Sequence, residues 1–261
     1  MIDAGEGRRL ERFGGHVVDR PHPGADDRRR APERWRDADL RFEREVGWRG
    51  DAGGAWVVTV DDLRLELRTT AAGQVGMFPE HAAVLPWLRD RITDHEGAPS
   101  VLNLFAYTGL VTLALARAGA SVAHVDAAKP SVEWARRNAD LNGLADRPIR
   151  WLVDDARGFV AREIRRGRRY DGVVLDPPTY GHGIGGKAWR VERDLGPLLD
   201  DVRRVLAPGG FVHLTAHTTA LDPFTLGGFV GRRVDIGELA IEATSGAVLS
   251  LGAYARVAAA S

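Results

Sequence analysis

The sequence predicts an α/β fold, because apolar segments typical of buried strands alternate with segments of helical character. Two stretches carry this prediction. Residues 101–109 (VLNLFAYTG) pass from a strand-like segment into a turn that ends at Gly109, and the helical residues 110–117 follow. Residues 173–180 (VVLDPPTY) again lead an apolar strand into a turn. Successive units of strand, turn and helix form a Rossmann-like sheet, which binds ligands beyond the carboxyl ends of its strands.

The composition is that of a globular protein without a global electrostatic signature. The 261 residues allow one large domain with a smaller companion, and 44% hydrophobic residues suffice for a core. Because Lys+Arg 36 balance Asp+Glu 36, any RNA-binding surface would have to be a local patch. The absence of cysteine excludes disulfides, thiolate metal sites and cysteine nucleophiles. Without a signal peptide or a membrane-spanning apolar run, we expect a cytoplasmic location.

The first part of the chain reads as an irregular segment followed by a small β unit. Residues 1–51 are rich in arginine, aspartate, glycine and proline, and we expect a solvated arm that is partly ordered against the main body. A basic arm that contacts RNA phosphates is the alternative, but interleaved acidic residues favour the first interpretation. Residues 55–75 predict a hairpin, since strands 56–60 and 63–68 flank Asp61-Asp62.

The remaining elements follow in an order that suits one large sheet. We predict strands at residues 101–104, 121–125, 149–153, 172–175, 211–216, 234–241 and 253–257. We predict helices at residues 82–92, 110–117, 128–142, 156–166 and 195–206. The glycine-rich residues 181–187 predict a mobile loop that closes over a substrate. We therefore expect an arm with a small accessory unit at residues 1–97 and a Rossmann-like domain at residues 98–261.

Acidic residues follow two of these strands directly. Asp126 ends strand 121–125 about 20 residues after the glycine turn, where Rossmann-like folds place an acceptor for ribose hydroxyls. Asp154 and Asp155 follow strand 149–153. The alternative for each acid is a cap of the helix that comes next. The position of Asp126 flush against a strand end favours the ribose interpretation.

Residues 101–109 and 173–180 together resemble motifs of the class I S-adenosylmethionine-dependent methyltransferases. The first is similar to their cofactor loop, and the second to the Asp-Pro-Pro-aromatic motif of amino- and base-methylating members. Over roughly the last two thirds of the chain, the sequence most resembles the subfamily of bacterial large-subunit ribosomal RNA cytosine-C5 and guanine-N7 methyltransferases. The resemblance implies a seven-stranded, mostly parallel sheet with helices on both faces and an antiparallel edge pair.

The resemblance also implies S-adenosyl-L-methionine as the cofactor. Asp155 would then accept a hydrogen bond from the adenine amino group. For Phe78 and Glu80 two interpretations stand: a loop over the cofactor, or a core plug and a helix start. The implied cofactor-binding residues are Phe78, Glu80, Asn103, Phe105, Tyr107, Thr108, Gly109, Asp126, Ala127, Asp155, Ala156 and Asp176.

The candidate catalytic residues are Asp176, Pro177, Pro178 and Tyr180. The Asp176 carboxylate and the Pro177 carbonyl can accept both hydrogens of an amino nucleophile, which turns the nitrogen lone pair toward the methyl group. Proline has no N–H that could compete with the substrate for these acceptors. Tyr180 offers a flat face to a planar substrate. The alternative is a strand-ending turn with a packing tyrosine. We expect neither a metal nor a membrane partner.

We predict methylation of a nitrogen of an RNA base, with an rRNA-type substrate. Cytosine-C5 methylation needs a cysteine nucleophile, which this chain lacks. A small-molecule N- or O-methyltransferase and a non-catalytic cofactor-binding scaffold are the alternatives, and the intact motif at residues 176–180 argues against the scaffold. Residues 162–169 form the strongest basic cluster, which suits a helix end or a phosphate contact.

Overall fold

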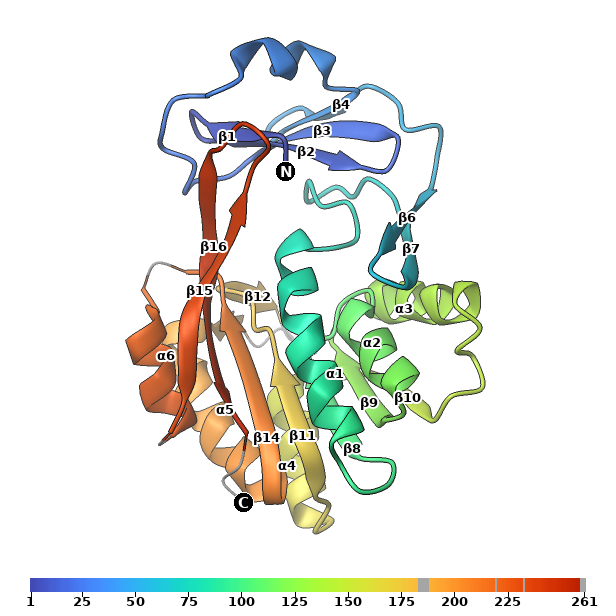
Figure 1. The fold of residues 1–261 in the computed structure, drawn as a ribbon. Coiled ribbons are helices and arrows are strands. Elements are labelled where there is room, and N and C mark those ends of the chain that lie inside the picture. Colours follow the sequence, from blue (N-terminus) through green and yellow to red (C-terminus); the bar gives the residue numbers. More distant parts are fainter. Residues whose placement is uncertain (183–187, 219, 232, 259–261) are drawn as a thin grey trace. The chain divides into compact units, whose positions relative to one another are not determined.

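The structure is a computed structural model of residues 1–261, and it describes residues 1–182, 188–218, 220–231 and 233–258. The chain divides into two compact units (Figure 1). The first comprises residues 1–82 and 239–251, and the second comprises residues 83–238 and 252–261. In the described part of the chain, no helix is both long and apolar enough to span a bilayer.

The second unit is built on a seven-stranded sheet with the order β10-β9-β8-β11-β14-β16-β15. The five strands from β10 to β14 pair in parallel, and β16 pairs antiparallel with β14. The predicted fold class is therefore confirmed. The strands are β8 (Ser100–Leu104), β9 (Ser121–Asp126), β10 (Ile149–Val153), β11 (Tyr170–Leu175), β14 (Leu206–Ala216), β15 (Asp235–Glu242) and β16 (Val248–Val257).

Helices cover both faces of this sheet in two layers (Figure 1). One layer holds α1 (Leu85–Thr93), α2 (Leu110–Ala118) and α3 (Lys129–Leu141). The other holds α4 (Ala156–Arg165), α5 (Val191–Val205) and α6 (Pro223–Val230). Central strand residues such as Leu102, Leu104 and Val173 are fully buried, as expected for a parallel sheet covered on both sides.

The predicted elements of this unit are present, and the structure differs from the prediction at several boundaries. Helix α5 begins at Val191 rather than at residue 195, because Val191 packs into the core and the Asp194 carboxylate accepts from the backbone of Arg190. Strand β14 begins at Leu206 rather than at residue 211. Helix α6 was not predicted, since its glycines disfavour a helix. A Cβ at Gly227 would lie 2.9 Å from Ile236, so packing requires the glycine.

The first unit overturns the expectation of a solvated arm at residues 1–51. Five strands form one sheet in the order β1-β2-β3-β4-β5, with a 3-10 helix, η1 (Pro32–Asp37), between β3 and β4. Leu10, Val18 and Leu40 are almost fully buried in this unit. The strands are β1 (Asp3–Gly5), β2 (Arg8–Phe13), β3 (His16–Pro21), β4 (Leu40–Glu43) and β5 (Gly47–Arg49).

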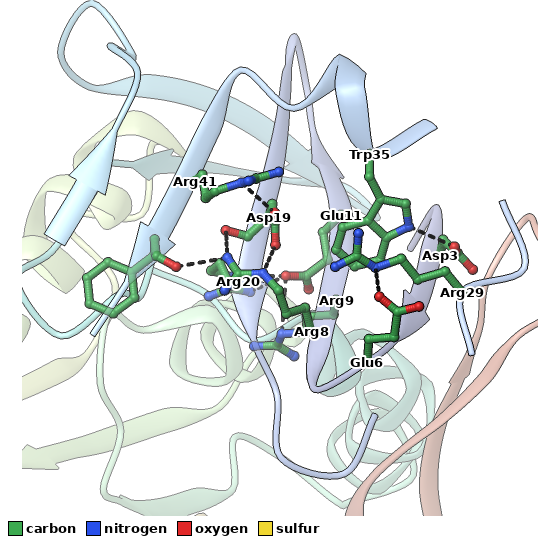
Figure 2. A network of polar contacts seen from close by, with 11 residues as sticks. Asp3, Glu6, Arg8, Arg9, Glu11, Asp19, Arg20, Arg29, Trp35 and Arg41 are labelled. Carbon is green, nitrogen blue, oxygen red and sulfur yellow. Dashed lines mark hydrogen bonds and ion pairs between the residues drawn. The ribbon is translucent and has the colours of Figure 1, made fainter. Parts of the chain in front are cut away.

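The prediction failed because the charged residues of this segment are paired inside the fold rather than solvated (Figure 2). Arg20, 2% exposed, donates to Glu11 from Nε at 2.9 Å and from Nη2 at 2.5 Å. The fully buried Asp19 accepts from Arg8 at 2.5 Å and pairs with Arg41 at 2.8 Å. Buried charges persist only when they are paired in this way, so composition alone gave no sign of the sheet.

The predicted hairpin is confirmed as β6 (Trp56–Val60) and β7 (Leu63–Leu67), which pair antiparallel. Asp61 has φ of 56°, a turn conformation that aspartate tolerates. The expected helix at residues 82–92 is α1, preceded by the 3-10 helix η2 (Pro79–Val84). Because α1 packs against α2, the division of the chain falls after residue 82, ahead of the boundary expected at residue 97.

Candidate active site

The turn between β8 and α2 has an unusual backbone. Phe105 has φ of 57° and Tyr107 has φ of 48°, values that non-glycine residues adopt only at a cost in free energy. Three hydrogen bonds hold this conformation: Ala106 N donates to Val125 O at 3.1 Å, Tyr107 N to the Asp126 carboxylate at 2.8 Å, and Asn138 Nδ2 to Thr108 O at 3.0 Å. Strained backbone that is fixed in this way is concentrated at functional sites.

Gly109 ends this turn and is the N-cap of α2, with φ of 95°. A Cβ at this position would lie 3.0 Å from the Cβ of Ala135 in α3. The resemblance implied a cofactor-binding role for this glycine. The structure gives two internal reasons for the glycine, the positive φ and the contact with α3.

A buried polar chain lies among β8, α2 and β9. Asn103 is 3% exposed, and its Nδ2 donates to Thr112 Oγ1 at 2.9 Å. Thr112 Oγ1 is in turn 2.9 Å from His124 Nδ1. Burial lowers the pKa of His124 to about 3, so this imidazole is neutral at physiological pH. Asn103, a predicted cofactor residue, thus has its side-chain amide committed to the interior, and its cofactor role stays a prediction.

Asp126 joins the end of β9 to both neighbouring segments. Its Oδ2 accepts from Tyr107 N and its Oδ1 from Ala128 N, each at 2.8 Å. Burial raises the pKa of this carboxyl group, although the two N–H donors act in the opposite direction. The N-cap of α3 is Ala128, so Asp126 is not itself the helix cap that was the alternative interpretation. Ala127 lies exposed between them.

The two acids after β10 have different contacts. Asp155 is the N-cap of α4, and its Oδ1 accepts from Gly158 N at 2.9 Å, so the capping interpretation holds for this residue. Asp154 pairs with Arg162 and accepts from Asp155 N at 2.9 Å. An ionised carboxylate has about four acceptor positions, so capping is compatible with the predicted contact to an adenine amino group. Ala156 begins α4 and is buried.

The motif at residues 176–180 follows the end of β11. Asp176 Oδ1 accepts from the Thr215 hydroxyl, and it lies 2.8 Å from Nε2 of His217. Trp189 Nε1 donates to the carbonyl of Pro178 at 2.7 Å. Strand β12 (Tyr180–His182) pairs antiparallel with β13 (Ala188–Arg190), so the turn is braced on both sides. The predicted mobile loop lies mostly outside the described residues, since 183–187 are not among them.

Tyr180 is about half exposed beside the motif. The residue is 52% exposed, and the guanidinium of Arg190 lies 5.8 Å from the ring centroid. A tyrosine that served only to pack the turn would be expected to be buried. The partial exposure of Tyr180 does not fit a purely packing role, and its stacking role stays a prediction.

The sheet brings the two anchor stretches together. β8 and β11 are parallel neighbours with Leu104 paired to Leu175, so Phe105 and Asp176 follow at the same edge of the sheet. The ring centroids of Phe105 and Trp189 lie 5.0 Å apart, which links the two turns directly. The strand order reverses between β8 and β11, and ligands in open α/β sheets bind at such a reversal.

Three residues at this edge were missed by sequence reasoning: Trp189, Thr215 and His217. Thr215 and His217 come at the end of β14, which pairs in parallel with β11 through Leu214 and Leu175. Polar side chains at the carboxyl end of the strand predicted at residues 211–216 were the available signal. Trp189 had none, because it follows the glycine-rich segment from which no element was predicted.

Phe78 and Glu80 belong to the first unit, and the structure describes them within that unit. Glu80 is 4% exposed in η2, and Phe78 packs edge-on against His81 with ring centroids 5.8 Å apart. Burial and the charge of Arg20 lower the pKa of Arg9. Glu80 lies close enough to Arg9 to act in the opposite direction. The position of Glu80 in η2 fits the helix-start interpretation, whereas Phe78 is only partly buried, and the cofactor role of both residues stays a prediction.

The basic cluster at residues 162–169 has internal partners. Arg162 pairs with Asp154, Arg166 with Glu163 at 2.8 Å, and Arg169 donates to the carbonyl of Arg204. Arg169 directly precedes β11, so it lies at the amino end of that strand. Asp176 follows the opposite, carboxyl end. Both observations favour a structural role for these arginines over contact with a substrate at the strand ends.

Comparison with known proteins identifies the family. The profile of the S-adenosylmethionine-dependent methyltransferases matches residues 38–234. The chain belongs to this family. It is therefore an enzyme of the methyltransferase class whose cofactor is S-adenosylmethionine, and the resemblance predicted from residues 101–109 and 173–180 is confirmed.

Relatives and solved structures agree with this assignment. The crystal structure of the SAM-dependent methyltransferase from Agrobacterium tumefaciens superposes with a TM-score of 0.92 at 36% identity, covering 98% of this chain and 88% of that one. The putative methyltransferase SMU.776, complexed with SAH, shares the fold with a TM-score of 0.75 at 17% identity, over 96% of this chain and 71% of that one.

A ribosomal RNA large subunit methyltransferase K/L from Methylococcus capsulatus is 35% identical over 171 residues, which is 64% of this chain. The matched region is 20% of that protein, so this chain spans about a fifth of the length of such a relative.

The chemistry of the strand-end residues fits S-adenosylmethionine. Its ribose hydroxyls, adenine amino group and methionine ammonium are hydrogen-bond donors, and they need acceptors. Carboxylates follow β9, β10 and β11 in the structure, at the same edge of one sheet. The constrained turn at residues 105–109 lies between the ends of β9 and β11 in this arrangement.

Proposed function

We propose that this chain methylates a nitrogen of an RNA base, with Asp176, Pro177, Pro178 and Tyr180 at the reacting group. The observation that carries the proposal is the position of Asp176: its carboxylate follows β11, directly beside the turn that follows β8. A carboxylate there suits an amino nucleophile, which must be held by its hydrogens while its lone pair points elsewhere. The ribosomal RNA methyltransferases among the relatives support RNA as the substrate class.

In this proposal, the cofactor lies along the carboxyl ends of β8, β9 and β10. Asp126 accepts from the ribose hydroxyls and Asp155 from the adenine amino group. The turn at residues 103–109 and the flanking Ala127 and Ala156 supply the close backbone contacts, while Phe78 and Glu80 are the predicted contacts from the first unit. All but these last two fall within residues 98–261, which we propose as the methyltransferase domain, with residues 1–97 as the accessory part.

When bound, S-adenosylmethionine supplies a sulfonium methyl group, which bonds to the nitrogen lone pair as the carbon–sulfur electrons return to a neutral thioether. The residues need not create a strong nucleophile. Asp176 and the Pro177 carbonyl hold the acceptor nitrogen in line, and Asp176 is an acceptor for the proton that the methylated nitrogen releases.

Tyr180 supports a base as the acceptor. Its exposed ring offers a stacking surface for an unpaired base, and sequence-specific RNA recognition usually targets such splayed bases. The formal net charge of +0 favours the alternative of a small-molecule acceptor, because no general attraction to a polyanion exists. The expected cytoplasmic location suits either substrate.

A labelling experiment separates the two. The full chain is incubated with tritiated S-adenosylmethionine and either total RNA or small metabolites from cells that lack this protein. We expect label in large ribosomal RNA, recovered after nuclease digestion as an N-methylated base and absent with Asp176→Ala. Label confined to the metabolite fraction would overturn RNA as the substrate.

A further inference from the structure

We propose that His217 is a positioning residue that, together with Thr215, aims the Asp176 carboxylate at the methyl acceptor. The inference rests on the proposed role of Asp176. Neither residue belongs to the motif that predicted the function: Thr215 lies in β14, and His217 directly follows that strand.

The geometry places two donors on one oxygen. Thr215 is 2% exposed, and its hydroxyl contacts Asp176 Oδ1. His217 Nε2 lies 2.8 Å from the same Oδ1, with side chains 25% and 20% exposed for His217 and Asp176. Thr179 Oγ1, inside the motif, donates to the carbonyl of His217 at 3.3 Å. The histidine is thus tied to the turn through both its ring and its backbone.

Hydrogen positions follow from the chemistry of the partners. Thr215 Oγ1 also lies 3.3 Å from the carbonyl of Leu175, but a single hydroxyl proton goes to the shorter contact with the charged carboxylate. An ionised Asp176 has no proton to give, so the nitrogen of His217 beside it must carry one. Oδ1 then accepts two hydrogen bonds, one for each of its lone pairs.

The consequence is a fixed carboxylate. The χ2 torsion of aspartate has a broad, two-fold preference, so the strand end alone does not set the plane of the group. With Oδ1 anchored by Thr215 and His217, the orientation of Oδ2 is set as well. The fixed plane of the carboxylate then determines the direction from which the acceptor amine can meet it.

The test compares two substitutions at residue 217. In His217→Gln the amide Nε2 can donate from nearly the position of the imidazole Nε2, whereas His217→Leu keeps volume without a donor. With the acceptor that the labelling experiment identifies, we expect the single-turnover rate of His217→Leu to fall by roughly 10- to 100-fold, the cost of one preorganised donor or somewhat less. His217→Gln should recover most of that loss. Cofactor affinity and melting temperature should stay at wild-type values in both.

A second pair of residues provides the matched control. His95 Nε2 lies 3.7 Å from Asp171, a histidine–aspartate pair at the amino end of β11, away from the proposed site. His95→Leu should leave the rate unchanged. Thr215→Val, which removes the other donor, should slow the single turnover, and its combination with His217→Leu should approach the rate of Asp176→Ala.

The outcomes that overturn the inference are distinct from failure of the proposed function. If a folded His217→Leu enzyme keeps the wild-type rate while Asp176→Ala is inactive, the positioning role of His217 is refuted. The role proposed for Asp176 still stands in that case. A folded His217→Gln enzyme as slow as His217→Leu would show that donation to Oδ1 is not its role. A folded Asp176→Ala enzyme with the wild-type rate would instead refute the function proposed for the motif. If His217→Leu has a lowered melting temperature, the single-turnover rate of Thr215→Val tests instead whether anchoring of Oδ1 matters.

Discussion

The two units use acidic residues in different ways. In the first unit, Glu11 and Asp19 lie in a buried sheet and are paired with arginine side chains. In the second, Asp126 and Asp176 stand at strand ends, and the partners that the structure shows for them are backbone N–H groups, a hydroxyl and an imidazole. A carboxylate neutralised by a cation gives stability to its fold. A carboxylate at a strand end, held by backbone N–H, hydroxyl or imidazole donors, is placed where a ligand can meet it.

The largest expected effect tests the first half of this comparison. Glu11→Ala removes the carboxylate that pairs with Arg20 and Arg9, two buried cations that are 2% and 6% exposed. We expect a loss of about 3–5 kcal/mol in the free energy of unfolding, measured by denaturant titration. Glu43→Ala is the control in the same sheet, since its partner Arg49 is 62% exposed and surface pairs contribute at most about 1 kcal/mol. Equal losses in the two variants would contradict the distinction.

The second prediction concerns the strand-end acid at the motif. Asp176→Ala should lower turnover by about 100- to 1,000-fold, or roughly 2.7–4 kcal/mol, because a preorganised acceptor for the reacting amine is lost. Its melting temperature should stay close to that of the wild type. Tyr180→Ala should instead raise KM, since a stacking surface binds substrate and transition state alike. A drop in activity that merely follows the unfolded fraction would make the motif a structural turn.

The third prediction concerns cofactor affinity. Asp126→Ala should weaken S-adenosylmethionine binding by about 1–3 kcal/mol in calorimetry, the cost of unpaired polar groups in a buried contact. Because burial raises the pKa of Asp126, its carboxylate is protonated at a higher pH than that of an ordinary aspartate. Affinity should therefore fall as the pH drops through that raised pKa, and Asp126→Asn should remove this dependence. A wild-type affinity profile for Asp126→Asn would exclude the ribose contact.

The fourth prediction concerns how the free energy of unfolding depends on pH. His124 is neutral in the folded protein down to a pKa of about 3, while the unfolded chain binds a proton near pH 6.5. The unfolded state therefore gains the extra proton on acidification, and stability should fall by up to about 1.4 kcal/mol per pH unit between pH 6.5 and 3. His124→Asn, which retains a group near Nδ1, should flatten this limb of a stability–pH curve. An unchanged slope would mean that His124 is protonated in the fold.

The sequence predicted the second unit well because its strands carry nearly continuous apolar runs and its turns carry glycine, proline and acids. Such patterns are local, so Gly109, Asp126 and Asp176 could be placed at strand ends without knowledge of their partners. The first unit was missed because its core includes Arg20, Glu11 and Asp19, whose burial depends on pairing across strands. Pairing of this kind is invisible in composition.

The candidate site shows the same limit. Its acids were predicted individually, but the contacts of Asp176 with Thr215 and His217 depend on the adjacency of β11 and β14, which only the assembled sheet provides. The constrained backbone of Phe105 and Tyr107 was likewise not foreseeable, since neither residue type favours positive φ. The cofactor roles of the individual residues remain predictions that the substitutions above test.

The division of the chain into units has a consequence for biosynthesis. Residues 239–251 belong to the first unit, where Ser245 donates to Ile2 O at 3.1 Å and to Asp3 at 2.7 Å, and Arg30 reaches Gly246 O at 2.8 Å. A ribosome synthesises residues 1–82 long before this late segment emerges. The first unit must therefore wait, partly formed, through synthesis of most of the second, and bonds that span so much sequence are slow to close.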